Sequence, residues 1–149
     1  MYGRYFDDFI VGEVIEHSLR KTITECDNNF FCLLTMNHHP VHIDVEYASA
    51  AQHKKILVVG TYVFSLVVGL SVADVSGKAI ANLEYEKILH HSPVFIGDTI
   101  RAVTTVLDVK ESDSKSDRGV VYVKTNAYNQ HDVIVLSFLR KVLIPKRCI

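Results

Sequence analysis

Three histidines stand close together in the segment Asn37-His38-His39-Pro40-Val41-His42-Ile43-Asp44. An imidazole titrates near neutral pH and can carry a proton, so His42 is a candidate acid/base group. A side-chain amide such as that of Asn37 can hold a water molecule but cannot take a proton from it. The residues alone leave open that His42 is a packed or surface histidine.

The same histidines also suggest a metal site. Pro40 interrupts the helical spacing that would place two of them on one face, and the chain offers no second cluster of ligands. We therefore expect no metal. The cysteines Cys26, Cys32 and Cys148 follow neither a zinc spacing nor a disulfide framework. We expect packing or surface roles for them, in a reducing compartment.

The segment 56–73, ILVVGTYVFSLVVGLSVA, carries no charged side chain. Its length approaches that of a membrane span. However, it contains Gly60, Ser65 and Gly69, and the residues after it alternate between apolar and polar as strands do. Those strands need an apolar partner. We therefore predict a helix that is apolar on all sides because a sheet wraps around it, starting near Gly60 and ending at 74–77.

The remaining elements are predicted from caps and alternation. Thr24, followed by Glu25 and Asp27, predicts the N-cap of a helix that runs to Met36. Its residues Cys26, Phe30, Leu33 and Leu34 share one face. Strands are predicted over 13–23, 79–89, 99–109, 120–128 and 133–144.

Between the two long helices, Pro40 predicts an ordered turn or loop, and Asp44 is predicted to cap a short helix over 45–52. The order of elements predicts a single α+β domain over residues 1–149, with a curled antiparallel sheet around a long central helix. Such a five-stranded sheet leaves an exposed edge and an open face.

Composition restricts the partners. The chain of 149 residues has a net charge of −1 with scattered basic residues, so we expect neither nucleic acid nor an anionic membrane as partner. The start, MYGRYFDDF, does not resemble a signal peptide. We expect a cytoplasmic protein.

Two segments resemble the MaoC-like dehydratases, hotdog-fold hydratases that act on acyl-CoA thioesters. Residues 37–44 are similar to the family pattern D-x-N-P-x-H-x-D, and residues 93–100, PVFIGDTI, are similar to its P-V-F-x-G-D. Gly60 stands where the family has a glycine opening the central helix, and Ser65 where it has a serine one turn later. The resemblance covers nearly the whole chain and implies a single hotdog domain.

Three further segments resemble a subgroup, the mesaconyl-CoA hydratases, which are also β-methylmalyl-CoA dehydratases. They are LLTMN at 33–37, GLSVAD at 69–74 and ANL at 81–83. This resemblance implies a branched or dicarboxylic acyl group in the substrate.

The family resemblance implies a lyase that adds water reversibly to the double bond of an α,β-unsaturated acyl-CoA. His42 would shuttle the proton, and Asn37 would hold the water. The backbone N–H of Gly60 would stabilise the enolate-like oxygen, and we assign Ser65 and His39 with Gly60 to substrate binding. Coenzyme A belongs to the substrate, so no cofactor is expected. Hotdog relatives pair their sheet edges, which implies a homodimer or a multiple of one, with the pocket at the interface.

Two positions depart from the family. Asn37 replaces the aspartate that (R)-specific enoyl-CoA hydratases pair with the histidine, and Val59 replaces a histidine before the helix glycine. These changes leave a second hypothesis open, in which the chain is a non-hydrating hotdog protein: an acyl-thioester-binding module or a thioesterase.

Overall fold

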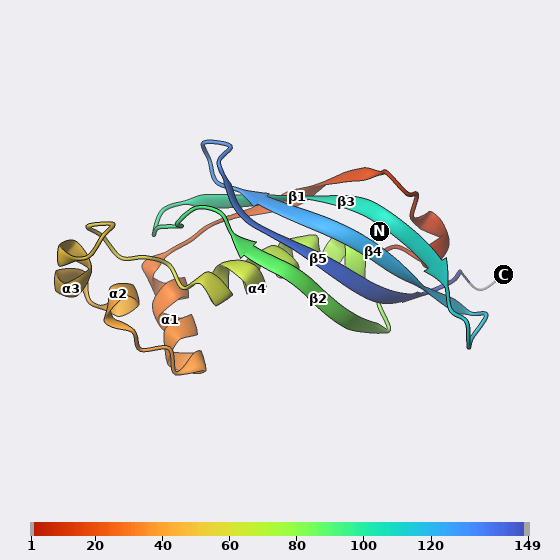
Figure 1. The fold of residues 1–149 in the computed structure, drawn as a ribbon, viewed down its shortest axis with the longest axis horizontal. Coiled ribbons are helices and arrows are strands. Elements are labelled where there is room, and N and C mark those ends of the chain that lie inside the picture. Colours follow the sequence, from red (N-terminus) through yellow and green to blue (C-terminus); the bar gives the residue numbers. More distant parts are fainter. Residues whose placement is uncertain (1, 148–149) are drawn as a thin grey trace.

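The computed structural model describes residues 2–147. Five antiparallel strands form one sheet in the order β1-β3-β4-β5-β2. The sheet curls over the helix α4, while the other helices gather at one end and both chain ends lie at the other (Figure 1). This confirms the predicted α+β class with a curled sheet around a central helix. The strands are β1 (Val14–Thr22), β2 (Ala81–His90), β3 (Thr99–Glu111), β4 (Arg118–Tyr128) and β5 (Ile134–Pro145), and the helices are α1 (Glu25–Thr35), α2 (Pro40–Ile43), α3 (Val45–Ala50) and α4 (Gly60–Ser71).

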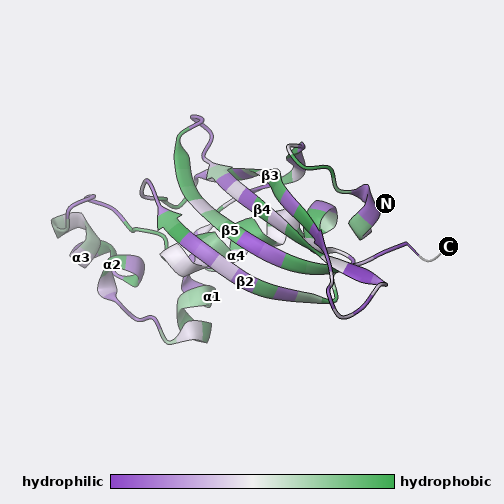
Figure 2. Cartoon of the chain, turned by 45° about the vertical axis from the view of Figure 1, so that its right-hand side comes forward, coloured by the Kyte–Doolittle hydropathy of each residue, from purple (hydrophilic) through white to green (hydrophobic). Residues whose placement is uncertain are grey.

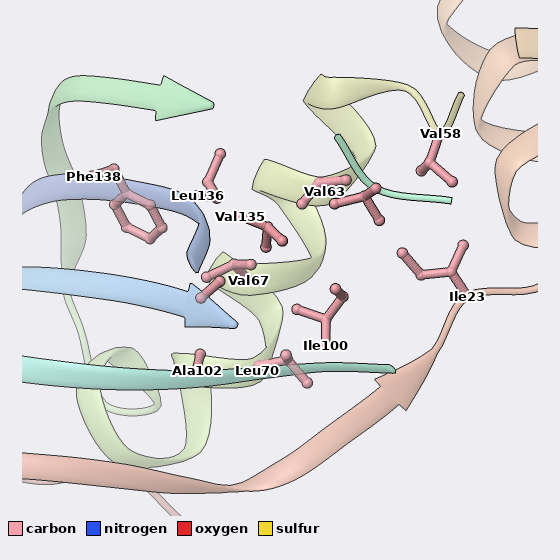
Figure 3. Packing of buried hydrophobic residues seen from close by; sticks show 12 residues of the cluster. Ile23, Val58, Val63, Val67, Leu70, Ile100, Ala102, Val135, Leu136 and Phe138 are labelled. Carbon is pink, nitrogen blue, oxygen red and sulfur yellow. The ribbon is translucent and has the colours of Figure 1, made fainter. Parts of the chain in front are cut away.

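The central helix packs its buried face directly on the sheet. Val63, Val67 and Leu70 recur at helical spacing and are buried. They face residues of β3 and β5, among them Ile100 and Leu136 (Figure 3). Full burial of each such side chain stabilises the fold by about 1.5–3 kcal/mol. No helix among residues 2–147 has the length and apolarity needed to cross a membrane.

The helix starts at Gly60, as predicted, and continues beyond Ser71 as a π-helical turn, η2 (Val72–Ser76). The apolar run gives no sign of a boundary between residues 56–59 and the helix. In the structure these four residues precede the helix as extended chain. There Leu57 forms an isolated antiparallel bridge with Phe95. The bridge fixes where the chain enters α4.

The strands show the alternation expected of a sheet with one covered face (Figure 2). On β4, Val121, Val123 and Ala127 are buried, whereas Lys124 is exposed. The inner face therefore meets α4, and the outer face is polar. At the far end of α4, Asp74 accepts a 2.8 Å hydrogen bond from the buried ring of His17, which ties η2 to β1.

The helix α1 has the predicted capping box. The hydroxyl of Thr24 accepts from the N–H of Asp27 at 3.2 Å, and the Asp27 carboxylate accepts from the N–H of Thr24 at 2.8 Å. The apolar face predicted from sequence is not the buried face: Asn28 and Cys32 are buried. Phe30, Leu33 and Leu34 are each more than 60% exposed.

A second core cluster lies at the end of the sheet away from α1. Phe6 and Phe9, at the short turn η1 (Phe6–Asp8), pack against strand residues of this cluster. The main-chain N–H of Arg147 donates to the carboxylate of Asp7 at 2.8 Å, and the Arg147 guanidinium donates to Asp8 at 2.7 Å. The two ends of the described chain are therefore joined.

Cys26 is exposed and Cys32 buried, and neither forms a disulfide. Burial raises the pKa of the Cys32 thiol, as expected for a residue that packs in the interior. Cys148 lies outside the described residues.

Candidate active site

The loop between α1 and α3 is ordered, as predicted. Met36 ends α1 in the left-handed conformation (φ 60°), and the N–H of Asn37 bonds the carbonyl of Cys32 at 3.1 Å. Pro40 then begins α2, where its missing N–H costs no hydrogen bond. This single turn places His42 at its third position.

The ring of His42 is oriented by a main-chain acceptor. Its Nδ1 lies 2.6 Å from the carbonyl oxygen of Leu57. A carbonyl only accepts, so Nδ1 carries the proton, and Nε2 of the neutral ring keeps a free lone pair. A fixed tautomer with a free nitrogen is what a general base requires.

A buried amide connects this loop to the start of α4. The side chain of Asn28 donates to the carbonyl of His42 at 2.8 Å and accepts from the N–H of Val59 at 3.1 Å. Asn28 is completely buried. Both its bonds involve main-chain groups, so it fixes the backbone of the loop against the residue that precedes Gly60.

A cavity of about 290 Å³ lies between the loop, the start of α4 and the end of β2. This volume is at the lower end of the range for ligand pockets, which suits a short acyl group. No carboxylate lies among its lining residues, which are His42, His53, Leu57, Val58, Gly60, Val63, His90, His91, Ser92, Pro93 and Val94.

Gly60 leaves space for the ring of His90. A methyl group placed on Gly60 would lie 2.8 Å from Cε1 and 3.1 Å from Nε2 of His90, closer than side chains pack. Gly60 is also the first residue of α4, where the N–H has no acceptor within the helix. The cavity thus contains a histidine ring in contact with the end of α4 that carries the positive end of its dipole.

The structure brings together two of the five residues assigned from sequence. His42 and Gly60 line the cavity, whereas Asn37, His39 and Ser65 do not. Asn37 is half-buried and Ser65 is exposed. Nδ1 of His39 accepts the N–H of Val41 at 3.2 Å and so caps α2. The chemical roles of all five remain predictions.

Sequence reasoning did not assign Asn28, His53 or His90. The pair His90-His91 before the segment at Pro93 was a usable signal, because that segment carries part of the family resemblance. No signal in the sequence pointed to Asn28, since a single polar residue within a helix usually faces solvent.

A second cavity, of about 320 Å³, lies beyond the bridge between Leu57 and Phe95. Lys54 and Lys55 line it, with the Nζ of Lys55 3.9 Å from the centroid of the Phe95 ring. His53, which lines the first cavity, contacts the same ring at a centroid distance of 5.6 Å. Phe95 therefore lines the second cavity and contacts a lining residue of the first. Within the described chain, no group of three His, Cys, Asp or Glu side chains is arranged to hold a metal ion.

Comparison with curated proteins shows two relatives that match almost all of this chain. The mesaconyl-CoA hydratase of Cereibacter sphaeroides is 37% identical over 145 residues, which are 97% of this chain and 42% of that protein. The beta-methylmalyl-CoA dehydratase of Chloroflexus aurantiacus is 33% identical over 146 residues, 97% of this chain and 41% of that protein. The chain thus spans about two fifths of the length of these relatives.

Solved structures agree on the fold. A monoamine oxidase regulatory protein from Archaeoglobus fulgius superposes with a TM-score of 0.85 at 33% identity, over 98% of this chain and 97% of that one. A Mycobacterium tuberculosis protein with a double hotdog fold superposes with a TM-score of 0.87 at 21% identity, over 97% of this chain and 45% of that one. The fold is therefore the hotdog fold.

The sequence model of the MaoC like domain matches residues 8–129. The match includes the loop with His42, the whole of α4 and the end of β2, so it covers every element that lines the first cavity. The chain belongs to the MaoC-like domain family.

Proposed function

We propose that the chain is a hydratase/dehydratase, a lyase that adds water reversibly to the double bond of an α,β-unsaturated acyl-CoA. The observation that carries the proposal is the hydrogen bond from His42 Nδ1 to the carbonyl of Leu57, which leaves Nε2 free in a cavity shared with Gly60. Two relatives whose names describe this reaction support it.

In the proposed reaction, Nε2 of His42 takes a proton from water while the water oxygen bonds to the β-carbon. The electrons of the double bond move to the thioester oxygen, and the free N–H of Gly60 stabilises the resulting enolate. The imidazolium of His42 then returns the proton to the α-carbon, so one water is added and the enzyme is regenerated. The role of Asn37 in orienting the water stays a prediction from the family resemblance, because Asn37 does not line the cavity.

The second cavity suits the charged part of coenzyme A. Lys54 and Lys55 can pair with phosphate groups and outnumber the one acidic lining residue, Glu25. The ring of Phe95 contacts both Lys55 and His53, which lines the first cavity. A thioester could therefore place its acyl end near His42 and its phosphates near the lysines. A branched or dicarboxylic acyl group, as in mesaconyl-CoA, is the finer proposal.

A homodimer, or a multiple of one, also belongs to this proposal. Among residues 2–147, the edge strand β2 bonds only to β5, and its Leu83 and Leu89 are more than half exposed. Unpaired edges with apolar side chains favour pairing with another chain. Most of α1's apolar face is exposed as well. Cytoplasmic location and the absence of a cofactor remain predictions.

The test follows the ultraviolet absorbance of the enoyl thioester with crotonyl-CoA and mesaconyl-CoA. Wild type should consume the double bond, and His42→Ala should be slower by about a hundred- to ten-thousandfold, the usual contribution of an acid/base group. His131→Ala, in the exposed turn before β5, is the matched control. Equal rates in wild type and His42→Ala would reject the proposed role of His42.

The second candidate function is a thioester-binding module or a thioesterase. It is favoured by two observations: no carboxylate is among the described residues that line the cavity, and Asn37 occupies the position of the family aspartate. A thiol reagent in the same assay separates the functions, because hydrolysis releases free coenzyme A and hydration does not. Binding without either signal would indicate the module.

A further inference from the structure

We propose that His90, assisted by His53, recognises a carboxylate on the acyl group and so selects dicarboxylic acyl-CoA substrates. This inference rests on the proposed function, because it assigns a selectivity to the same cavity. It concerns two residues that neither the sequence patterns nor the reaction scheme uses.

His90 lies beside the start of α4. A methyl group placed on Gly60 would lie only 2.8 Å from Cε1 and 3.1 Å from Nε2 of the His90 ring. Gly60 supplies the N–H that is proposed to bind the thioester oxygen. His90 therefore lies within the length of a short acyl chain from the proposed oxyanion donor, which is the reach of the second carboxylate of a four-carbon dicarboxylic acyl group.

Two histidine rings in the cavity retain their hydrogen-bonding capacity. Of the four histidines in the cavity, His42 bonds Leu57, and Nε2 of His91 lies 2.7 Å from the hydroxyl of Ser137. Within residues 2–147 the rings of His53 and His90 make no hydrogen bond, and His53 has only its edge contact with Phe95. Two imidazoles are thus free to donate to a ligand.

Most of the remaining cavity wall is apolar. Leu57, Val58, Val63, Pro93 and Val94 are apolar, and no lining residue is acidic. An uncharged enoyl group would need only these apolar contacts. A carboxylate in such a cavity needs donors, because removing a charge from water without hydrogen bonds is costly. The free histidines are the donors that such a group would require.

The test uses two substrates that differ only at the end of the acyl chain. Crotonyl-CoA ends in a methyl group where fumaryl-CoA carries a carboxylate. We expect His90→Ala to lower the ratio of kcat/KM for fumaryl-CoA over crotonyl-CoA by about ten- to a hundredfold, the range for a hydrogen bond to a charged group. His90→Gln, which retains a donor, should lose less, and His53→Ala should fall between wild type and His90→Ala. His131→Ala should leave the ratio unchanged.

Calorimetry with succinyl-CoA and butyryl-CoA gives a second measurement that needs no turnover. Wild type should bind succinyl-CoA more tightly than butyryl-CoA, and His90→Ala should lose this preference. If wild type hydrates neither enoyl thioester but shows this preference, the proposed reaction fails and carboxylate recognition stands. An unchanged ratio in His90→Ala, or the absence of a preference in wild type, would overturn the role of His90.

Discussion

The side-chain amide of Asn28 donates a 2.8 Å hydrogen bond to the main-chain carbonyl of His42. The same amide accepts from the N–H of Val59, the residue before Gly60. One completely buried side chain thus sets the spacing between the proposed base and the proposed oxyanion donor, although it contacts neither group that would react. Such a residue acts on the reaction by positioning.

Replacing Asn28 with leucine should therefore affect both stability and rate. Asn28→Leu keeps the volume but removes the side-chain partner of the His42 carbonyl and of the buried N–H of Val59, so the free energy of unfolding should fall by about 1–3 kcal/mol. The kcat of hydration should fall more than KM changes, when both are measured under conditions in which the variant is folded. Asn29→Leu, one residue along α1 and only partly buried, is the control. If Asn28→Leu had the same free energy of unfolding in urea as wild type, this assignment would be contradicted.

Asn37 and His42 should differ in their contributions to rate. An amide can orient water but cannot activate it, so Asn37→Ala should slow hydration less than His42→Ala does. Asn37→Asp restores the family carboxylate five residues before His42. Its rate with crotonyl-CoA should rise, or its pH–rate profile should move. If Asn37→Asp and Asn37→Ala both had the pH–rate profile of wild type, Asn37 would only shape the loop.

The capping box of α1 should make stability depend on pH. The N–H of Thr24 lowers the pKa of Asp27 to about 2, and the Lys21 ammonium adds to this. The unfolded value is about 3.9. Because the folded pKa is depressed, the stabilisation is complete above about pH 4 and disappears as the pH falls to about 2. The melting temperature of wild type should exceed that of Asp27→Asn at pH 6, by an amount equivalent to about 1 kcal/mol. A difference that persisted at pH 2 would exclude this explanation.

The proposed dimer predicts unequal effects at the two sheet edges. Leu83 on β2 and Leu19 on β1 are 52% and 55% exposed. A lysine at an edge that pairs with another chain should break the pairing, whereas a lysine at a solvated edge should not. Light scattering at micromolar concentration should therefore give a monomer mass for Leu83→Lys and a dimer mass for Leu19→Lys. Equal masses in both variants would place the interface elsewhere.

The elements of the fold were predictable because each had a local cause. Caps at Thr24 and Asp44 and the uncharged run after Lys55 determine the helices, and the predicted strands differ from the observed ones by at most two residues at either end. The buried face of α1 was not predictable. Its orientation depends on the two hydrogen bonds of Asn28, which join residues far apart in sequence.

The site was predictable only where a short motif contained it. His42 and Gly60 belong to segments with recognisable patterns, and both line the cavity. His90 reaches the same cavity from the end of β2, thirty positions after Gly60, and only the register of β2 on β5 places it there. The position of His90 before Pro93 was a signal in the sequence, but no spacing rule connects a strand end with a helix start, so its closeness to Gly60 was not predictable.

The contact between Asp7 and Arg147 spans 140 residues. Phe6 and Phe9 share a core cluster with the β5 residues Val142 and Ile144, which follow them by more than 130 positions. The two aromatic rings therefore lack these neighbours until that long segment has been synthesised, a state open to chaperones and to aggregation. Final closure of this hotdog is consequently a late step, limited by long-range contacts.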